Sequence, residues 1–127
     1  MKKSDKPVNF RPPYIGAAYY PEDWPVTEIE NDIQAMKKIG VNMVRIAEFA
    51  WSAMEPEEGK YNFQWLHNVF KKLEKNNIAV VLCTPTATPP AWLTQKYPDV
   101  FRVNDDMLPN THGGRRHNCP NSPTYRK

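Results

Sequence analysis

The sequence has only two cysteines and no long apolar run, and these absences limit where the protein acts. Cys83 and Cys119 are too few for a disulfide framework, so a reducing cytoplasm is the simpler interpretation. No stretch is long and apolar enough to span a membrane. Residues 4–13, which follow the basic start, contain no apolar core of a signal peptide. We therefore expect a cytoplasmic protein with no membrane partner.

Signatures of nucleic-acid and nucleotide binding are also missing. The formal net charge of +3 is small and dispersed, unlike the concentrated positive charge of a nucleic-acid-binding surface. The segment 21–26, which follows the first predicted strand, lacks the glycine-rich phosphate-binding fingerprint. A nucleic-acid partner and a nucleotide-binding sheet are both disfavoured.

The hydrophobic content and the apolar runs of the sequence are typical of a packed α/β region. Of the 127 residues, 40% are hydrophobic, which suits one modest domain or part of a larger one. Three apolar runs predict strands at residues 15–20, 41–47 and 78–83. The third run is continuous and rich in β-branched residues, which is typical of a strand buried on both faces.

Two helices are predicted between these strands. Thr27 and Glu30 have the spacing of a capping box with Thr27 as the N-cap residue, and Gly40 is placed to end this first helix. The second helix ends at Asn77, a residue that adopts the left-handed conformation readily. Its apolar stripe consists of Leu66, Val69, Phe70 and Leu73.

The alternation of strands and helices predicts right-handed βαβ units and a parallel sheet. Loops after the strands are long and polar, whereas loops after the helices have about one or two residues, an asymmetry typical of sheets and barrels whose sites lie at the carboxyl ends of the strands. Prolines concentrated at 85–90 and 120–123 stiffen two of these loops. Pro90 and Ser122 are each expected to begin a helix.

Six segments, in order, resemble the N-terminal part of the glycoside hydrolase family 42 β-galactosidases. The most specific are Thr-Pro-Thr-Ala-Thr-Pro-Pro at 84–90 and Arg-Arg-His-x-Cys at 115–119. The Glu-Pro-x-x-Gly-x-Tyr segment at 55–61 is less specific, because many sugar-cleaving barrels contain something similar. The other matching segments are 16–25, 42–45 and 48–52.

The resemblance implies a TIM (β/α)8 barrel, of which residues 14–127 would form about three β/α units, truncated before the fourth strand. Residues 1–13 are expected to be a flexible lead-in. The resemblance also implies retaining hydrolysis of terminal non-reducing β-D-galactose residues by two glutamates. The acid/base glutamate of the family follows an asparagine, and no Asn-Glu pair occurs here. Both catalytic glutamates are therefore expected beyond Lys127, and none is assigned.

Arg115 is the substrate-binding residue that the resemblance implies, because its guanidinium would donate hydrogen bonds to sugar hydroxyls in the first subsite. Its neighbour Arg116 is expected to brace the loop. Cys119 matches the first of several cysteines that hold a structural zinc in the family, and the other ligands would lie beyond Lys127. No cofactor is implied for catalysis. The implied partners are a β-galactoside and, for the full-length protein, further copies of itself.

Other residues near these motifs have a structural and a functional interpretation. Glu48 and Glu55 follow the second strand, where they suit the rim of a site, but hydrogen bonds that fix the loop 48–61 are the favoured interpretation. His117 is interpreted as packing within its own loop rather than as a proton donor. No carboxylate pair for glycoside hydrolysis is assigned among them.

Three tryptophans and Cys83 are each assigned either to the core or to the pocket wall. Trp65 lies in a helical stripe and is assigned to the core. Cys83, at the end of the third strand, is assigned to the core as a small apolar residue. Trp51 and Trp92 follow strands and are candidates for the pocket wall, where their rings would stack on sugar.

Two alternatives stay open. One is another retaining glycosidase of the same barrel superfamily, with a different terminal sugar. The other is a non-catalytic, truncated remnant. An Asn-Glu pair encoded about 30–40 residues downstream would favour the enzyme, whereas a stop codon after Lys127 would favour the remnant.

We expect the 127-residue polypeptide alone not to hydrolyse β-galactosides, because neither carboxylate of the double-displacement mechanism is assigned within it. The measurement is release of nitrophenol from a nitrophenyl β-galactoside by the purified chain, with a heat-treated sample as the control. Turnover above that control contradicts the expectation.

Overall fold

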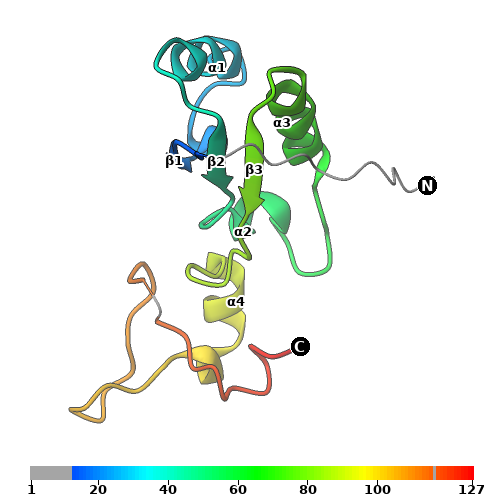
Figure 1. Cartoon of the computed structure of the whole chain (residues 1–127). Coiled ribbons are helices and arrows are strands. Elements are labelled where there is room, and N and C mark those ends of the chain that lie inside the picture. Colours follow the sequence, from blue (N-terminus) through cyan, green and yellow to red (C-terminus); the bar gives the residue numbers. More distant parts are fainter. Residues whose placement is uncertain (1–12, 116) are drawn as a thin grey trace.

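The computed structural model of the chain describes residues 13–115 and 117–127. The predicted flexible lead-in lies outside the described residues, except for Pro13. Within the described ranges, no helix combines the length and the apolar content that crossing a membrane requires. The described residues form one small sheet with helices packed against it, followed by a long irregular segment (Figure 1).

The sheet has three parallel strands in the order of the sequence, β1 (Gly16–Tyr19), β2 (Met43–Ile46) and β3 (Ala79–Leu82). Helix α1 (Ile29–Lys38) lies between β1 and β2 in the chain, and helix α3 (Gln64–Lys75) precedes β3. Each strand pairs along its whole length with its neighbour. The predicted α/β class and parallel sheet are confirmed.

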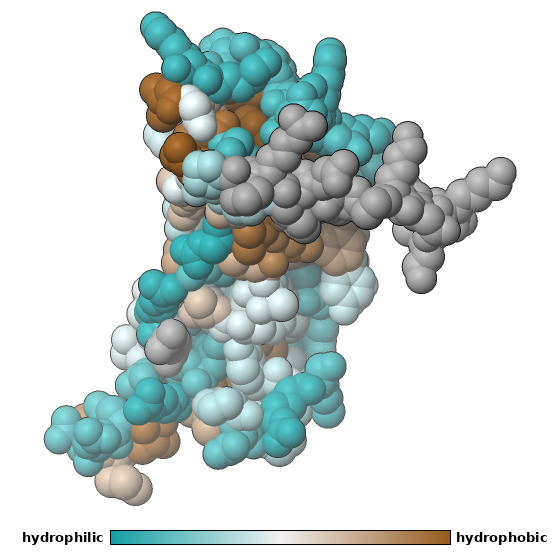
Figure 2. Space-filling view, viewed as in Figure 1, coloured by the Kyte–Doolittle hydropathy of each residue, from teal (hydrophilic) through white to brown (hydrophobic). Residues whose placement is uncertain are grey.

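The core lies between the sheet and these two helices. Ile33 of α1 is fully buried and belongs to one cluster with Val44 and Ile46 of β2. Trp65 packs against this cluster, as predicted. Figure 2 shows apolar residues at the level of the sheet, between hydrophilic surfaces on either side. The predicted stripe of α3 is confirmed by its buried members Leu66, Val69 and Leu73, with Phe70 partly buried beside them.

Both long helices end in the same backbone arrangement. Gly40 has φ +83°, and its N–H donates to the carbonyl of Lys37 at 3.1 Å, while the Val41 N–H donates to the carbonyl of Met36 at 2.9 Å. These are the two bonds of a Schellman motif. Asn77, with φ +57°, ends α3 with the corresponding pair of bonds. Both predicted helix ends are therefore confirmed.

The prediction that Thr27 caps the first helix is wrong. Helix α1 begins at Ile29 with Glu28 as the N-cap residue, and no side chain accepts a capping hydrogen bond. The Glu28 N–H donates to the carbonyl of Pro25 at 2.9 Å, and Glu28 already has helical backbone angles of −80° and −20°. A turn that follows Pro25 thus leads directly into the helix, which leaves Thr27 in that turn with no capping role.

The prediction that residues 78–83 form a strand buried on both faces is also wrong for the described residues. β3 lies at one edge of the three-stranded sheet, so one side has no neighbouring strand among the residues described. Val81 is 43% exposed and Leu82 is 54% exposed as a result. The apolar sequence of β3 is therefore suited to more neighbours than this sheet supplies.

The segments after the strands contain short helices that position the site. The predicted loop 48–61 includes the short helix α2 (Trp51–Met54), which was not predicted from the sequence. α4 (Ala91–Lys96) begins one residue after Pro90, which is its N-cap residue rather than its first helical residue. Short 3-10 helices occupy Pro21–Asp23 and Pro98–Val100.

The irregular segment 97–127 lies beyond the carboxyl ends of the strands. Helices α1 and α3 lie toward the opposite end of the sheet (Figure 1). Near its end, the Ser122 hydroxyl accepts a hydrogen bond from the Tyr125 N–H at 3.1 Å and donates to Asp99 at 2.8 Å. The Ser122 hydroxyl accepts from the third following N–H, as an N-cap residue does. Residues 123–126 form turns, however, so the helix predicted to begin at Ser122 is not found within residues 117–127.

The two matching helix ends provide a controlled test of the fold. Gly40→Ala places a Cβ on a residue with φ +83° and should lower the free energy of unfolding by about 1 kcal/mol. Asn77→Gly relieves a φ of +57° and should raise it by a few tenths of a kcal/mol. Urea unfolding of both variants measures these changes in the free energy of unfolding. Changes of the same sign would rule out the left-handed strain at both positions.

Candidate functional site

A cleft of about 890 Å³ lies at the carboxyl ends of β2 and β3. It is bordered by the end of each strand and by the irregular segment that follows α4. This is the edge of the sheet at which the loop asymmetry predicted a site. The residues that line it are Glu48, Leu82, Cys83, Thr84, Thr86, Ala87, Arg102, Arg115, Asn118, Cys119, Pro120, Asn121 and Tyr125.

Glu48 is the first charged group after β2, and the backbone before it is unusual. Ala47 is completely buried and has φ +67°, a left-handed conformation that is costly for a residue with a side chain. The Ala47 carbonyl accepts a hydrogen bond from the Ala50 N–H at 3.4 Å as the chain turns. This sharp turn directly after the strand leaves the Glu48 residue only 8% exposed at the edge of the cleft.

The Glu48 carboxylate pairs with two arginines, one on each oxygen. Its Oε2 lies 2.5 Å from Nη2 of Arg45 on β2, and its Oε1 lies 2.5 Å from Nη2 of Arg115. The negative charge of Glu48 is the main cause of a raised pKa of Arg45. Glu48 thus joins the sheet to the irregular segment, and the interpretation that it fixes the loop 48–61 is replaced by this longer-range role.

The Arg115 guanidinium has fixed partners, but the side chain stays largely exposed. Its guanidinium carbon lies 5.4 Å from the centre of the Phe49 ring, and that ring stacks on Tyr20 at 5.6 Å. The Arg115 side chain remains 58% exposed at the wall of the cleft. A guanidinium has five donors, and one of them donates to Glu48, which leaves further donors of this cleft-lining residue for a ligand. Arg116 lies outside the described residues.

Glu55 does fix the loop 48–61, as predicted. Its carboxylate accepts hydrogen bonds from Trp51 Nε1 at 2.8 Å and from the Gly59 N–H at 2.8 Å. Its backbone carbonyl accepts one from Trp92 Nε1 at 2.9 Å. Both predicted wall tryptophans are therefore tied to the same residue.

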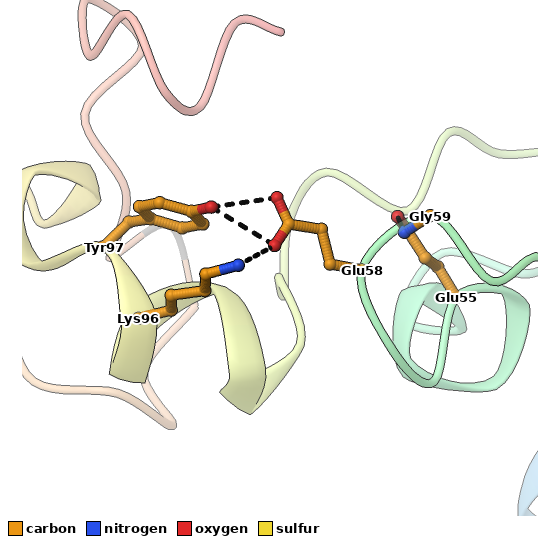
Figure 3. A network of polar contacts seen from close by, with 5 residues as sticks. All are labelled: Glu55, Glu58, Gly59, Lys96 and Tyr97. Carbon is orange, nitrogen blue, oxygen red and sulfur yellow. Dashed lines mark hydrogen bonds and ion pairs between the residues drawn. The ribbon is translucent and has the colours of Figure 1, made fainter.

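Glu58 links this loop to the end of α4. Its carboxylate pairs with Lys96 and accepts a hydrogen bond from the Tyr97 hydroxyl at 2.9 Å (Figure 3). The hydrogen bond from Lys96 is the largest cause of a lowered pKa of Glu58, and the hydrogen bond from Tyr97 lowers this pKa further. Trp51 and Trp92 line a second groove beside this network, of about 410 Å³, rather than the cleft that contains Arg115.

His117 is a packing residue, as predicted. It is 2% exposed, its Nδ1 is hydrogen-bonded to the carbonyl of Gly114, and its ring contacts those of Phe101 and His112. Its Nε2 has no hydrogen-bond partner among the described residues. The side chain holds the loop that contains Arg115 and does not line the cleft.

Cys119 and Cys83 both line the cleft, and both are half-buried free thiols. The assignment of Cys83 to the core is therefore wrong, because the turn after β3 places it at the cleft edge. Residues 13–115 and 117–127 contain no group of three or more His, Cys, Asp or Glu side chains that could hold a metal ion. A structural zinc needs four ligands, so the described residues do not complete such a site, and zinc at Cys119 stays a prediction.

Thr86, Asn118 and Tyr125 are among the cleft residues that were not individually predicted from the sequence. The carbonyl of Thr86 accepts a hydrogen bond from the Tyr125 hydroxyl at 2.8 Å and one from Asn118 Nδ2 at 3.4 Å. These bonds connect the loop after β3 to the end of the chain. The partner of the Tyr125 hydroxyl is a backbone carbonyl, and no sequence signal identifies such a partner.

The comparisons with known proteins agree with one another. A family model described as β-galactosidase matches residues 18–127. The chain is 47% identical over 114 residues to β-galactosidase YesZ of Bacillus licheniformis, covering 90% of this chain and 17% of that protein. It is 50% identical over 113 residues to β-galactosidase BgaA of Clostridium cellulovorans, covering 89% and 17%. The chain thus spans about a sixth of the length of these relatives.

Solved structures show the same relationship. The β-galactosidase of Halorubrum lacusprofundi superimposes with a TM-score of 0.84 at 43% identity, covering 89% of this chain and 17% of that one. The β-galactosidase of Bacillus circulans sp. alkalophilus superimposes with a TM-score of 0.85 at 38% identity, with the same coverage of 89% and 17%. The three strands described here therefore correspond to β/α units of the TIM barrel in these proteins.

The paired arginines predict a salt-sensitive contribution of Glu48 to stability. Glu48→Gln should lower the free energy of unfolding by about 1 kcal/mol at low salt, since both arginines are partly exposed and screened. About 1 M NaCl, with a Debye length near 3 Å, should remove much of this loss. Urea unfolding at both salt concentrations measures it, with the exposed Glu30→Gln on α1 as the matched control. A Glu48→Gln variant indistinguishable from Glu30→Gln would exclude the bridging role.

Proposed function

The chain belongs to the glycoside hydrolase family 42 β-galactosidases, and from this we propose that it forms part of the catalytic barrel of an enzyme that hydrolyses terminal non-reducing β-D-galactose residues. The match over residues 18–127 and the cleft at the carboxyl ends of the strands support the proposal. Residues 14–127 would be the first β/α units of that barrel. The activity is proposed for a protein of the relatives' length.

The proposed reaction is retaining hydrolysis, in which one carboxyl group protonates the leaving oxygen and a second attacks the anomeric carbon from about 5–5.5 Å away. Glu48 suits neither role, because each of its oxygens is already paired with an arginine. Glu55 suits neither role, because its carboxylate accepts from Trp51 and Gly59. The contribution of this chain is therefore substrate binding and not proton transfer or nucleophilic attack.

The observation on which the proposal depends is the geometry of Arg115. Its guanidinium is fixed from behind by Glu48 and Phe49 and exposed toward the cleft. A planar donor group held in one orientation suits the vicinal hydroxyls of a sugar, and it can also hold the nucleophilic carboxylate. Because the arginine is oriented before substrate arrives, little side-chain entropy is lost on binding.

The test uses a chimera in which this chain replaces the matching segment of one of the β-galactosidases named above. Arg115→Ala should lower kcat/KM for a nitrophenyl β-galactoside about tenfold or more, equivalent to about 1.4 kcal/mol. Arg45→Ala is the matched control, because Arg45 pairs with the same carboxylate but does not line the cleft. Arg115→Lys should restore only part of the loss, since a lysine lacks the planar fork.

Equal losses for Arg45→Ala and Arg115→Ala would mean that Arg115 only neutralises Glu48, and the substrate-binding role would be wrong. A chimera that folds and cleaves another terminal sugar but not galactose would overturn the proposed substrate class.

A further inference from the structure

An aromatic stack lies against the Arg115 guanidinium, and its two rings come from the ends of neighbouring strands. Tyr20 directly follows β1, and Phe49 lies shortly after the end of β2. The two rings are stacked, with centroids 5.6 Å apart and an angle of 20° between their planes. The Arg115 guanidinium carbon lies over the Phe49 ring at 5.4 Å. The three side chains therefore form successive layers, although each follows a different strand.

The first layer of this stack is fixed by the backbone around Tyr20. Tyr19, the last residue of β1, is buried, and its hydroxyl donates to Asp32 of α1 at 2.9 Å. Tyr20 is followed by the buried Pro21, and the Tyr20 carbonyl accepts a hydrogen bond from the Asp23 N–H at 3.2 Å. Because both neighbours of Tyr20 are buried, its half-buried side chain has few positions available.

Phe49 is also positioned by its neighbours in the chain. Glu48 and Ala50, on either side of it, are 8% and 2% exposed. Glu48 accepts a hydrogen bond from the Arg115 guanidinium, and Phe49 contacts the same guanidinium with its ring. Two consecutive residues therefore hold Arg115 by different forces, one through an ion pair and the other through a cation–π contact.

These two forces respond differently to salt. The Arg115 side chain is 58% exposed, so dissolved ions screen its attraction to Glu48. The contact of a guanidinium with an aromatic ring also includes stacking and dispersion, which dissolved ions do not screen. At high ionic strength the aromatic stack is therefore the stronger constraint on the orientation of the guanidinium.

We propose that Phe49, supported by Tyr20, is a positioning residue for Arg115 and maintains the orientation of the guanidinium when salt screens its ion pair with Glu48. Neither Tyr20 nor Phe49 is among the residues that line the cleft, so both act through Arg115 and do not touch the sugar. This inference rests on the proposed function, because the orientation matters only if Arg115 binds sugar. It adds the end of β1 to the elements that support the sugar-binding site.

The test measures the inhibition constant of D-galactose for the chimera described above at about 0.05 M and about 1 M NaCl. Galactose is neutral, so salt does not screen its binding directly, and the parent chimera should change by less than about twofold. Phe49→Leu should raise the inhibition constant about threefold at the lower salt concentration and about tenfold at the higher one, where the ion pair no longer compensates. Phe49→Tyr, which keeps the ring, should behave like the parent.

Two further measurements separate this role from a general effect on packing. Phe63 stacks on Tyr61 at 5.9 Å and does not line the cleft, so Phe63→Leu removes a comparable stacked ring and should leave the inhibition constant unchanged. In an Arg115→Ala background, Phe49→Leu should have no further effect at either salt concentration. A loss that persists without Arg115, that does not grow with salt, or that Phe49→Tyr shares would overturn the proposal.

Circular dichroism before each measurement establishes that the variant is folded. If Phe49→Leu does not fold, Tyr20→Leu replaces it and should raise the inhibition constant about twofold at the lower salt concentration and more at the higher one. An active chimera in which the ratio of variant to parent is the same at both salt concentrations rejects this inference, while the proposed function stands. A folded chimera that cleaves no β-galactoside rejects the proposed function, and this inference with it.

Discussion

The ion pairs of Glu48 are the interaction on which the arrangement of the site depends. A single, nearly buried carboxylate contacts Arg45 within the sheet and Arg115 in the irregular segment, 67 positions apart from it in the chain. A buried carboxylate without such partners would be strongly unfavourable, so the pairing requires the loop of Arg115 to lie over the end of β2. The left-handed turn at Ala47 places Glu48 there, at a local cost that the pairing offsets.

Much of the fold could be predicted because local sequence determines it. Gly40 and Asn77 end helices for reasons of backbone conformation alone, and the apolar stripe of α3 follows from helical periodicity. The failure at Thr27 has a local cause as well, since a turn after Pro25 competes with a capping box. The exposure of β3 could not be predicted from its composition, because burial depends on which strands lie beside it.

The site was predicted less completely, because its contacts join residues that are distant in the chain. The motif that contains Arg115 follows β3, and Arg115 lines the cleft at the edge of the sheet that the loop asymmetry indicated. The partner of Arg115 did not follow from the sequence, and Glu48 was interpreted as a residue of its own loop. The contact of Tyr125 with the carbonyl of Thr86 likewise depends on backbone geometry and not on residue type.

A double-mutant cycle would show whether Glu48 orients Arg115 for sugar binding. The inhibition constant of D-galactose would be measured for the chimera and for its Glu48→Gln, Arg115→Ala and doubly substituted forms. If Glu48 acts through Arg115, the two substitutions are strongly coupled: once Arg115 is removed, Glu48→Gln should have little further effect, with a coupling energy of about 1 kcal/mol or more. If the effects of the two substitutions simply add, Glu48 does not orient Arg115 for sugar binding.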